Sequence, residues 1–180
     1  MENQIATKRN RGKSELRIKY GILSIVFLIL IGCSSTSSVT NDIYLIPKGY
    51  EGNVYVFYNV KDAPSLTKEG DYDVYVINDM GYFVTSSPEM DYGRVTDKYY
   101  YVDKNGQRSP IQNDCVRGMG TGGLEKDIGT SNKIEIKYTG IEVTNNRCGQ
   151  SFMDGGNGMY PEDIDTVLKE ILKVQYGLDQ

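Results

Sequence analysis

The feature that most constrains the fold is an alternation of side chains with a period of two. It is clearest in NVYVFYNV, residues 53–60, where alternate positions hold Val54, Val56, Tyr58 and Val60, and the positions between them include Tyr55 and Phe57. Successive side chains of a β-strand point to opposite faces of the sheet. The segment is therefore predicted to be a strand with the first set on one face and the second set on the other.

Further strands are predicted over residues 43–46, 72–78, 82–85, 98–102 and 133–144, the last being one strand bent at Gly140 or two short ones. Turn residues stand between these segments. Asp79-Met80-Gly81 predicts a hairpin that pairs residues 72–78 with 82–85. Asn105-Gly106 predicts a reversal after residues 98–102.

One helix is predicted, over Pro161 to Tyr176. Its apolar residues are spaced as on one helix face, at Ile164, Val167, Leu168, Ile171 and Leu172. The opposite face has no excess of basic residues, so we expect the apolar face to pack on the core and not on a membrane.

Short strands with turn signals about every ten residues are typical of antiparallel β-folds. We predict a mainly β fold, an antiparallel β-sandwich of transthyretin-like or immunoglobulin-like type, with one C-terminal amphipathic helix. The predicted organisation is a signal peptide over residues 1–32, a lipid-bearing cysteine with a polar tether over 33–42, the sandwich over 43–150, and a flexible segment with the helix over 151–180.

The N-terminal segment has the parts of a secretory signal. Residues 1–20 hold six Lys and Arg against two Glu, and residues 21–31 are apolar apart from Ser24. Such a run fits the roughly 7 to 15 residues of a signal sequence and is shorter than the roughly 20 that a spanning helix needs. An uncleaved anchor helix, or an ordinary signal with an incidental cysteine, is the alternative.

The apolar run ends in Leu30-Ile31-Gly32-Cys33, which resembles the lipobox of bacterial lipoproteins. The resemblance implies cleavage before Cys33 and a diacylglyceryl group, with acyl chains such as palmitate, on its sulfur. The mature protein would then stay on the extracytoplasmic face of the cell membrane. Ser34 would permit sorting to an outer membrane in a cell that has one.

Charge and composition exclude several functions. Removing residues 1–32 takes away six of the 20 basic and two of the 24 acidic residues, which leaves a mature net charge of about −8. Such a surface repels phosphate backbones, so we expect no nucleic-acid partner. The chain has no His, which excludes Ser-His-Asp and Cys-His catalysis and His-bearing zinc sites.

Three cysteines become two once Cys33 is assigned to lipid. Outside the cytoplasm a disulfide between Cys115 and Cys148 is then expected, and closing this loop would stabilise the fold by roughly 3 to 4 kcal/mol. Two reduced thiols are the alternative. Residues 112–132 are glycine-rich and are expected to form a long loop that the disulfide holds down, and residues 153–159 are expected to be flexible.

Candidate sites are few. Tyr99, Tyr100 and Tyr101 are the candidate binding residues, either as an aromatic platform for sugar or peptide or as core and cross-strand packing, with Tyr99 and Tyr101 on one face and Tyr100 on the other. Residues 118–123 match GxGxxG, but the flanking sequence lacks the strand-to-helix context of a dinucleotide site. Asp103, Asn105 and Gln107 resemble a calcium loop, but an EF-hand is excluded by Arg108 and Asp114.

Two stretches carry a family resemblance: Ile46-Pro47-Lys48-Gly49-Tyr50-Glu51-Gly52 with the following NVYVFYNV, and Thr85-Ser86-Ser87-Pro88 with DKYYYVDKNGQRSPI. They resemble bacterial lipoproteins catalogued as domain of unknown function 6843, over roughly residues 43–150. The resemblance implies lipoprotein status and brings no activity or catalytic residue.

Three classes of function remain. We expect a non-catalytic lipoprotein, held to the membrane through Cys33, that contacts an envelope protein or glycan through its β-domain. A carbohydrate or small-ligand binding module is the first alternative. An enzyme that uses carboxylates or a redox-active Cys115 and Cys148 is the second, although the two cysteines lack CxxC spacing. We predict no catalytic residue, cofactor or metal.

Overall fold

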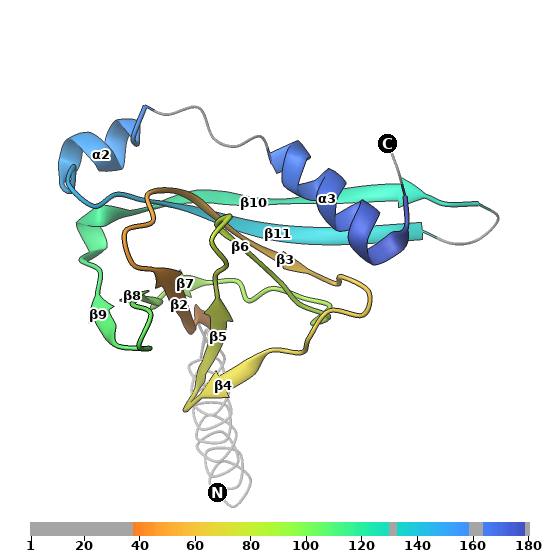
Figure 1. Cartoon of the computed structure of the whole chain (residues 1–180), viewed down its shortest axis with the longest axis horizontal. Coiled ribbons are helices and arrows are strands. Elements are labelled where there is room, and N and C mark those ends of the chain that lie inside the picture. Colours follow the sequence, from red (N-terminus) through yellow and green to blue (C-terminus); the bar gives the residue numbers. More distant parts are fainter. Residues whose placement is uncertain (1–37, 130–132, 159–163, 179–180) are drawn as a thin grey trace, which may run out of the picture. The chain divides into compact units, whose positions relative to one another are not determined.

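The computed structural model describes residues 38–129, 133–158 and 164–178. The predicted signal peptide, Cys33 and the first part of the tether lie outside the described residues. Strands hold far more of the described residues than helices do, which confirms the predicted mainly β class (Figure 1). No helix of this part of the chain is long and apolar enough to cross a membrane.

The strands form two main sheets and one short pair. The four-stranded sheet has the order β10 (Val116–Asp127), β11 (Lys133–Val143), β3 (Gly52–Tyr58), β6 (Tyr82–Val84). The five-stranded sheet has the order β4 (Thr67–Glu69), β5 (Tyr72–Val76), β2 (Asp42–Pro47), β8 (Lys98–Val102), β9 (Arg108–Pro110). The short pair is β1 (Val39–Thr40) with β7 (Arg94–Val95), and the helices are the 3-10 helix η1 (Asn113–Cys115), α2 (Gln150–Gly155) and α3 (Ile164–Tyr176).

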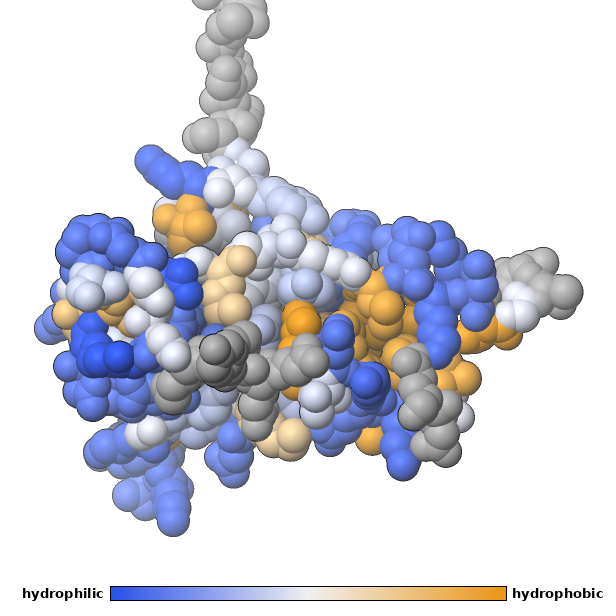
Figure 2. Space-filling view, turned by 90° about the horizontal axis from the view of Figure 1, so that it is seen from above, coloured by the Kyte–Doolittle hydropathy of each residue, from blue (hydrophilic) through white to orange (hydrophobic). Residues whose placement is uncertain are grey.

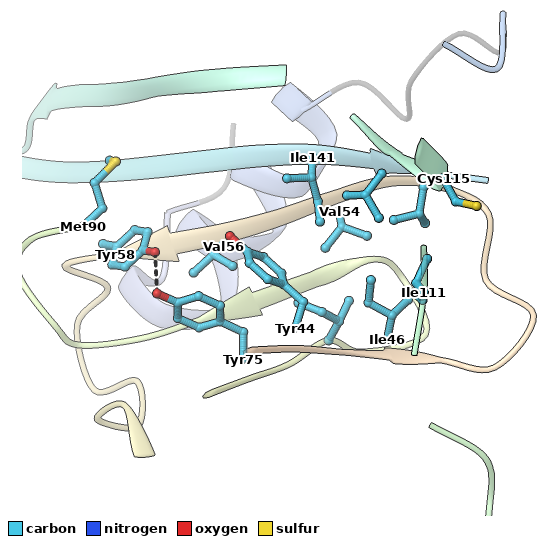
Figure 3. Close-up of a cluster of buried hydrophobic side chains, with 13 residues drawn as sticks. Tyr44, Ile46, Val54, Val56, Tyr58, Tyr75, Met90, Ile111, Cys115 and Ile141 are labelled. Carbon is cyan, nitrogen blue, oxygen red and sulfur yellow. Dashed lines mark hydrogen bonds between the residues drawn. The ribbon is translucent and has the colours of Figure 1, made fainter. Parts of the chain in front are cut away.

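The alternation in β3 supplies both faces of the four-stranded sheet. Val54, Val56 and Tyr58 join an inner cluster, the apolar side chains between the two sheets (Figure 3). Tyr55 and Phe57 join a helix-side cluster, the apolar side chains between the four-stranded sheet and α3. The prediction is thus confirmed within the strand. It is wrong for Val60, which lies in the helix-side cluster, because Asn59 has a φ of 59° and interrupts the alternation.

The helix-side cluster confirms that α3 packs on the core. Val167, Leu168, Ile171 and Leu172 are buried there, together with Ile134 and Ile136 of β11. Figure 2 views the molecule from this side and shows hydrophobic surface around α3 within a largely hydrophilic surface. Residues 161–163 of the predicted helix lie outside the described residues.

The sheets are mixed, where antiparallel sheets were expected. In the five-stranded sheet, β2 pairs in parallel with both β5 and β8, and in the four-stranded sheet β3 pairs in parallel with β6. Antiparallel pairing holds for β3 with β11, β10 with β11, β4 with β5, and β8 with β9. Parallel neighbours at the centre distinguish this fold from an all-antiparallel sandwich.

The predicted hairpin of residues 72–78 with 82–85 is wrong, because β5 and β6 belong to different sheets. The turn itself exists: the Asn78 side-chain oxygen accepts hydrogen bonds from the N–H groups of Met80 and Tyr82, each at 3.0 Å. Gly81 has a φ of 81°, and a Cβ there would lie 2.5 Å from the Asn53 carbonyl oxygen. The turn therefore carries the chain from one sheet to the other. The reversal at Asn105-Gly106 is confirmed, since β8 and β9 pair around it.

Residues 133–143 form one strand, the first of the two predicted alternatives. The glycine-rich segment is the larger surprise. Instead of a loop, residues 116–127 form β10, which pairs with β11 along its length with one bulge between Gly118 and Gly120. A Cβ on Gly122 would lie 2.3 Å from the Tyr138 hydroxyl, and one on Gly140 would lie 3.0 Å from the Tyr55 ring. Gly122 of β10 and Gly140 of β11 thus leave room for the rings of Tyr138 and Tyr55, which lie over them.

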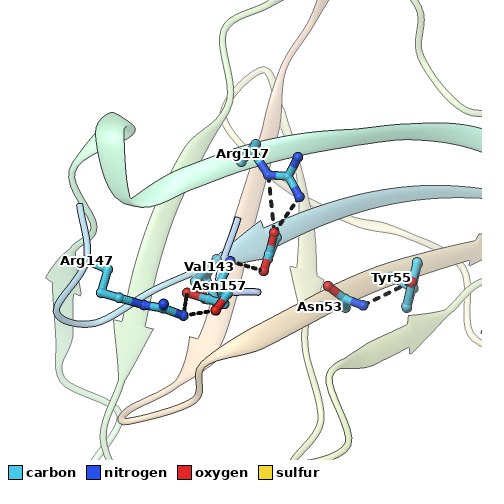
Figure 4. A network of polar contacts seen from close by, with 7 residues as sticks. Asn53, Tyr55, Arg117, Val143, Arg147 and Asn157 are labelled. Atoms are coloured by element: carbon cyan, nitrogen blue, oxygen red, sulfur yellow. Dashed lines mark hydrogen bonds and ion pairs between the residues drawn. The ribbon is translucent and has the colours of Figure 1, made fainter. Parts of the chain in front are cut away.

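Two links fasten the end of this hairpin. Cys115 and Cys148, which are 33 positions apart in sequence, are joined by a disulfide in the structure. Glu142, only 5% exposed, accepts hydrogen bonds from Arg117 at 2.7 and 3.2 Å and from the Asn157 N–H at 2.8 Å (Figure 4). Residues 153–159 were expected to be flexible, but residues 150–155 form α2, and Asn157 is held by its bond to Glu142.

Candidate functional site

A cleft of about 620 Å³ opens between the two sheets at one end of the inner cluster. Its walls come from the start of β2, the segment 90–97, Tyr99 of β8, and the facing parts of β10 and β11. Away from the cleft the inner face of the four-stranded sheet carries Val143, whereas at the cleft the same face carries Gly118, Thr121 and Thr139 beside Ile141. Small side chains therefore leave the space between the sheets open.

The charges of the cleft are of one sign. Asp42, Asp91 and Asp97 are among its lining residues, and none of the lining residues is Lys or Arg. Tyr44, Tyr58, Tyr92 and Tyr99 add aromatic rings. A pocket of this size, with aromatic walls and a small number of polar groups that converge on it, is typical of a ligand site.

Asp42 lies at the deep end of the cleft and is only 5% exposed. The Tyr58 hydroxyl donates a hydrogen bond to the Tyr75 hydroxyl, which donates in turn to the Asp42 carboxylate, each at 2.9 Å (Figure 3 shows the tyrosine pair). Burial, and next the charge of Asp97, raises the pKa of Asp42 to about 7. This carboxyl group therefore changes charge near neutral pH.

Asp97 is held by the first strand of the domain. Its carboxylate accepts hydrogen bonds from the Thr40 hydroxyl at 2.7 Å, the Asp42 N–H at 3.3 Å and the Tyr99 hydroxyl at 3.4 Å. Burial raises the pKa of Asp97 as well. The side chain of Thr96 bonds Thr40 and Asn41, so residues 38–41 fasten the segment that carries Asp97.

The remaining acids lie nearby. One carboxylate oxygen from each of Asp42, Asp73 and Asp91 lies within 4.8 Å of the others, a spacing that one cation could bridge. Lys68, however, already forms an ion pair with Asp73 at 3.0 Å. The cation that the cleft itself can accept is therefore best placed against Asp42, Asp91 and Asp97.

The structure separates the three candidate tyrosines. Tyr99 lines the cleft with its ring 5.2 Å from that of Tyr44. Tyr101 packs against the inner cluster and donates to the Tyr50 carbonyl at 3.2 Å, while Tyr100 pairs with Leu45 and Pro110 on the other face. The predicted division of faces agrees with this arrangement, and the three rings form no joint platform.

The face that bears Tyr100 is curled. Arg108 of β9 and Glu69 of β4, which stand at opposite edges of the five-stranded sheet, form an ion pair at 2.8 Å. Ile43 and Val74 point to this face and are buried, although neither belongs to the inner or the helix-side cluster. The curl therefore encloses apolar residues that a flat sheet would expose.

Two sequence motifs have structural explanations. The Asp103 carboxylate accepts hydrogen bonds from the N–H groups of Asn105 and Gln107, both at 2.9 Å, so it shapes the turn between β8 and β9. The GxGxxG match at residues 118–123 lies inside β10.

Sequence reasoning missed Asp42, Asp91 and Asp97. For Asp42 a signal was present: alternation in DIYLIP places this acid on the same buried face as Tyr44 and Ile46. Asp91 and Asp97 lie outside the strands, and no periodic pattern could have singled them out.

Comparisons with known proteins agree with the sequence resemblance. No curated protein matches the chain. The 2.75 Å crystal structure of a Bacillus anthracis protein, named "Putative Lipoprotein", is similar with a TM-score of 0.68 and 33% identity, covering 77% of this chain and 98% of that one. A family model matches residues 38–152, which include all the strands, while the end of α2 and α3 follow it. The chain therefore belongs to the family of unknown function DUF6843.

Proposed function

We propose that the protein is a lipoprotein held on the extracytoplasmic face of the membrane through Cys33. The signal-like N-terminus, the lipobox resemblance and the name of the Bacillus anthracis relative support this proposal. Cys33→Ser is expected to release the protein from the membrane fraction or to leave an uncleaved precursor. A mutant that still sediments with membranes at the mature mass would contradict the anchor.

The anchored domain then acts without catalysis, by holding a positively charged envelope or protein partner in the cleft. The observation that carries this proposal is a cleft of about 620 Å³ lined by Asp42, Asp91 and Asp97 with no basic residue. Like charges gathered in a partly desolvated space repel one another, and a cation placed between them removes that repulsion. A partner with a positive group is thus favoured over an acidic or phosphorylated one.

Catalysis by carboxylates is supported by one observation, the pKa of about 7 for Asp42. Such a value is common in active sites but also arises in structural acids. Asp42 is almost fully buried and already accepts a hydrogen bond from Tyr75, so a reacting group has poor access to it. Tyr92 also lines the cleft, and its aromatic ring could stack on a sugar as well as on a cation. A glycan is therefore the second candidate ligand.

A photo-crosslinking amino acid tests where the partner binds. Placed at Tyr92, which is 58% exposed at the cleft, it is expected to give a defined adduct in intact cells. Placed at Met80, which is 47% exposed and away from the cleft, it serves as the matched control. Equal adducts from both positions, or none from Tyr92, would refute binding at the cleft.

A further inference from the structure

We propose that the partner in the cleft is an extended, lysine- or arginine-bearing peptide segment that pairs with the free edge of β10 and directs a cationic side chain between the sheets. This inference rests on the proposed binding function and names its partner. It joins two independent features of the described structure, an unpaired strand edge and an acidic cleft beside it.

The edge of β10 differs from the other sheet edges. The edge strands β4, β6 and β9 have three residues each, whereas β10 has 12. Proteins commonly protect edges by keeping them short or by placing Lys or Pro on them. From Gly118 to Leu124 this edge has neither a charge nor a proline. A long edge of this kind can accept an added strand through main-chain hydrogen bonds.

The register identifies the free main-chain groups. The Tyr55 N–H donates to the Gly81 carbonyl on the β6 side, so the main-chain N–H and C=O groups of Tyr55 point away from β11. Gly140 is the β11 residue paired with Tyr55, and its main-chain groups therefore point toward β10. Gly140 is paired with Gly120, so the main-chain groups of Gly120 point toward β11. By alternation, Thr121, Gly123 and Glu125 direct their N–H and C=O groups outward. No main-chain hydrogen bond between described residues uses these groups outside the strand ladder.

The cleft lies directly beside this edge. Gly118, Gly120 and Thr121 of β10 line it, and Gly118 and Thr121 lie on the inner face with Ile141 and Thr139. A Cβ on Gly118 would meet nothing within 4 Å. Every second side chain of an added strand points to the same face of the sheet. A residue paired near Thr121 would thus project toward the cleft without an obstructing side chain on Gly118.

The charge of the cleft selects the side chain. Asp91 is exposed at its mouth, and Asp42 and Asp97 lie deeper. Lys and Arg have the length and the donors to reach Asp91 and Asp97 from a neighbouring strand, and tyrosine rings on the walls favour a cation further. An acidic or neutral segment could pair with the edge of β10 but would bring no positive charge to the carboxylates of the cleft.

The test measures binding of a fluorescein-labelled peptide of alternating Lys and Thr to the full-length protein in detergent, by fluorescence anisotropy. The same peptide with Glu in place of Lys is the control. We expect saturable, salt-sensitive binding of the Lys peptide alone. Equal binding of the Glu peptide would overturn the charge selection.

Two variants separate the features. Thr121→Pro removes an outward N–H without touching the β11 ladder, and Asp91→Asn removes a charge at the mouth; each is expected to weaken Lys-peptide binding about tenfold. Thr121→Ala keeps the N–H and measures how much of the loss comes from the side chain. Asp62→Asn, an exposed carboxylate outside the cleft, is the matched charge control. If Thr121→Pro fails to fold, Glu125→Pro removes another of the outward N–H groups.

The outcomes distinguish this inference from the proposed function. Unchanged peptide affinity in a folded proline variant would show that the cleft takes cations without strand pairing. Spermidine that displaces the peptide at equal charge concentration would point the same way. If no peptide binds while Tyr92 still gives its specific adduct in cells, the peptide inference fails and the cleft function stands.

Discussion

The two faces of the four-stranded sheet are built from the same strands, but one face is closed by packing and the other opens into a cleft. The helix-side face is closed by α3 and by tyrosine rings that lie over Gly122 and Gly140. The inner face is apolar near Val54 and Val143 but opens at its other end into the acidic cleft. One face is thus devoted to burial, and the other combines burial with a cavity.

The difference lies in what fills the space next to each face. α3 supplies the apolar side chains of Val167, Leu168, Ile171 and Leu172 to the helix-side cluster. The inner face meets a second sheet whose β2 begins with Asp42, so a carboxylate is buried where the sheets separate. A group that costs stability is expected where binding is the task, and the predictions below test that division from the largest effect to the smallest.

The largest effect is expected from Asp42. Its pKa is about 7 in the fold against a normal 3.8, so the folded protein retains a proton that the unfolded chain releases. The stability that Asp42 contributes is then fully present below about pH 4 and is lost as the pH rises to about 7, by up to about 4 kcal/mol. Asp97, Asp91 and Asp73 face this group and raise its pKa.

Asp42→Asn should flatten this profile and make the protein more stable than the wild type at pH 8. Chemical denaturation at a series of pH values measures it. A wild-type stability that stays constant from pH 4 to 8 would show that Asp42 is charged throughout. Burying this carboxylate would then not destabilise the fold, and the contrast between the two faces would fail.

Truncating the helix-side cluster should come next. Leu172→Ala removes a buried side chain of α3 and is expected to lower the free energy of unfolding by about 3 kcal/mol, since the neighbours cannot fully collapse into the space. Val174→Ala, on the same helix but 67% exposed, should change it by less than about 0.5 kcal/mol. Urea denaturation compares the two. Equal losses would mean that α3 does not seal this face.

The smallest effect compares two glycines of β10. Gly122→Ala places a methyl group where the Tyr138 hydroxyl lies, and is expected to cost about 2 kcal/mol. Gly118→Ala adds the same methyl group on the inner face, where nothing lies within 4 Å, and should be nearly neutral. The difference between their denaturation midpoints measures how much more tightly the helix-side face is packed. Similar costs for both variants would contradict the contrast.

Local pattern predicted much of this fold. The alternation of β3 assigned Val54, Val56 and Tyr58 to one face and Tyr55 and Phe57 to the other, because a strand exposes its period directly in its residues. The spacing of Val167, Leu168, Ile171 and Leu172 identified α3 for the same reason. The pair Cys115 and Cys148 followed from counting, and the structure joins them.

Strand partners and the cleft were decided by the tertiary structure. The turn at residues 79–81 was recognised, yet the next strand joins β3 and not β5, because pairing depends on which distant strand offers a free edge. The glycines of β10 carry no periodic signal, and the space next to one of them, Gly122, is filled by Tyr138 from the neighbouring strand β11. The sequence alone determined the mainly β class and the faces of β3 and α3, which depend on neighbours along the chain, and it indicated the cysteine pair by the number of cysteines. Only the tertiary structure could bring Asp42, Asp91, Asp97 and the edge of β10 together, because these groups meet through contacts between segments remote in sequence.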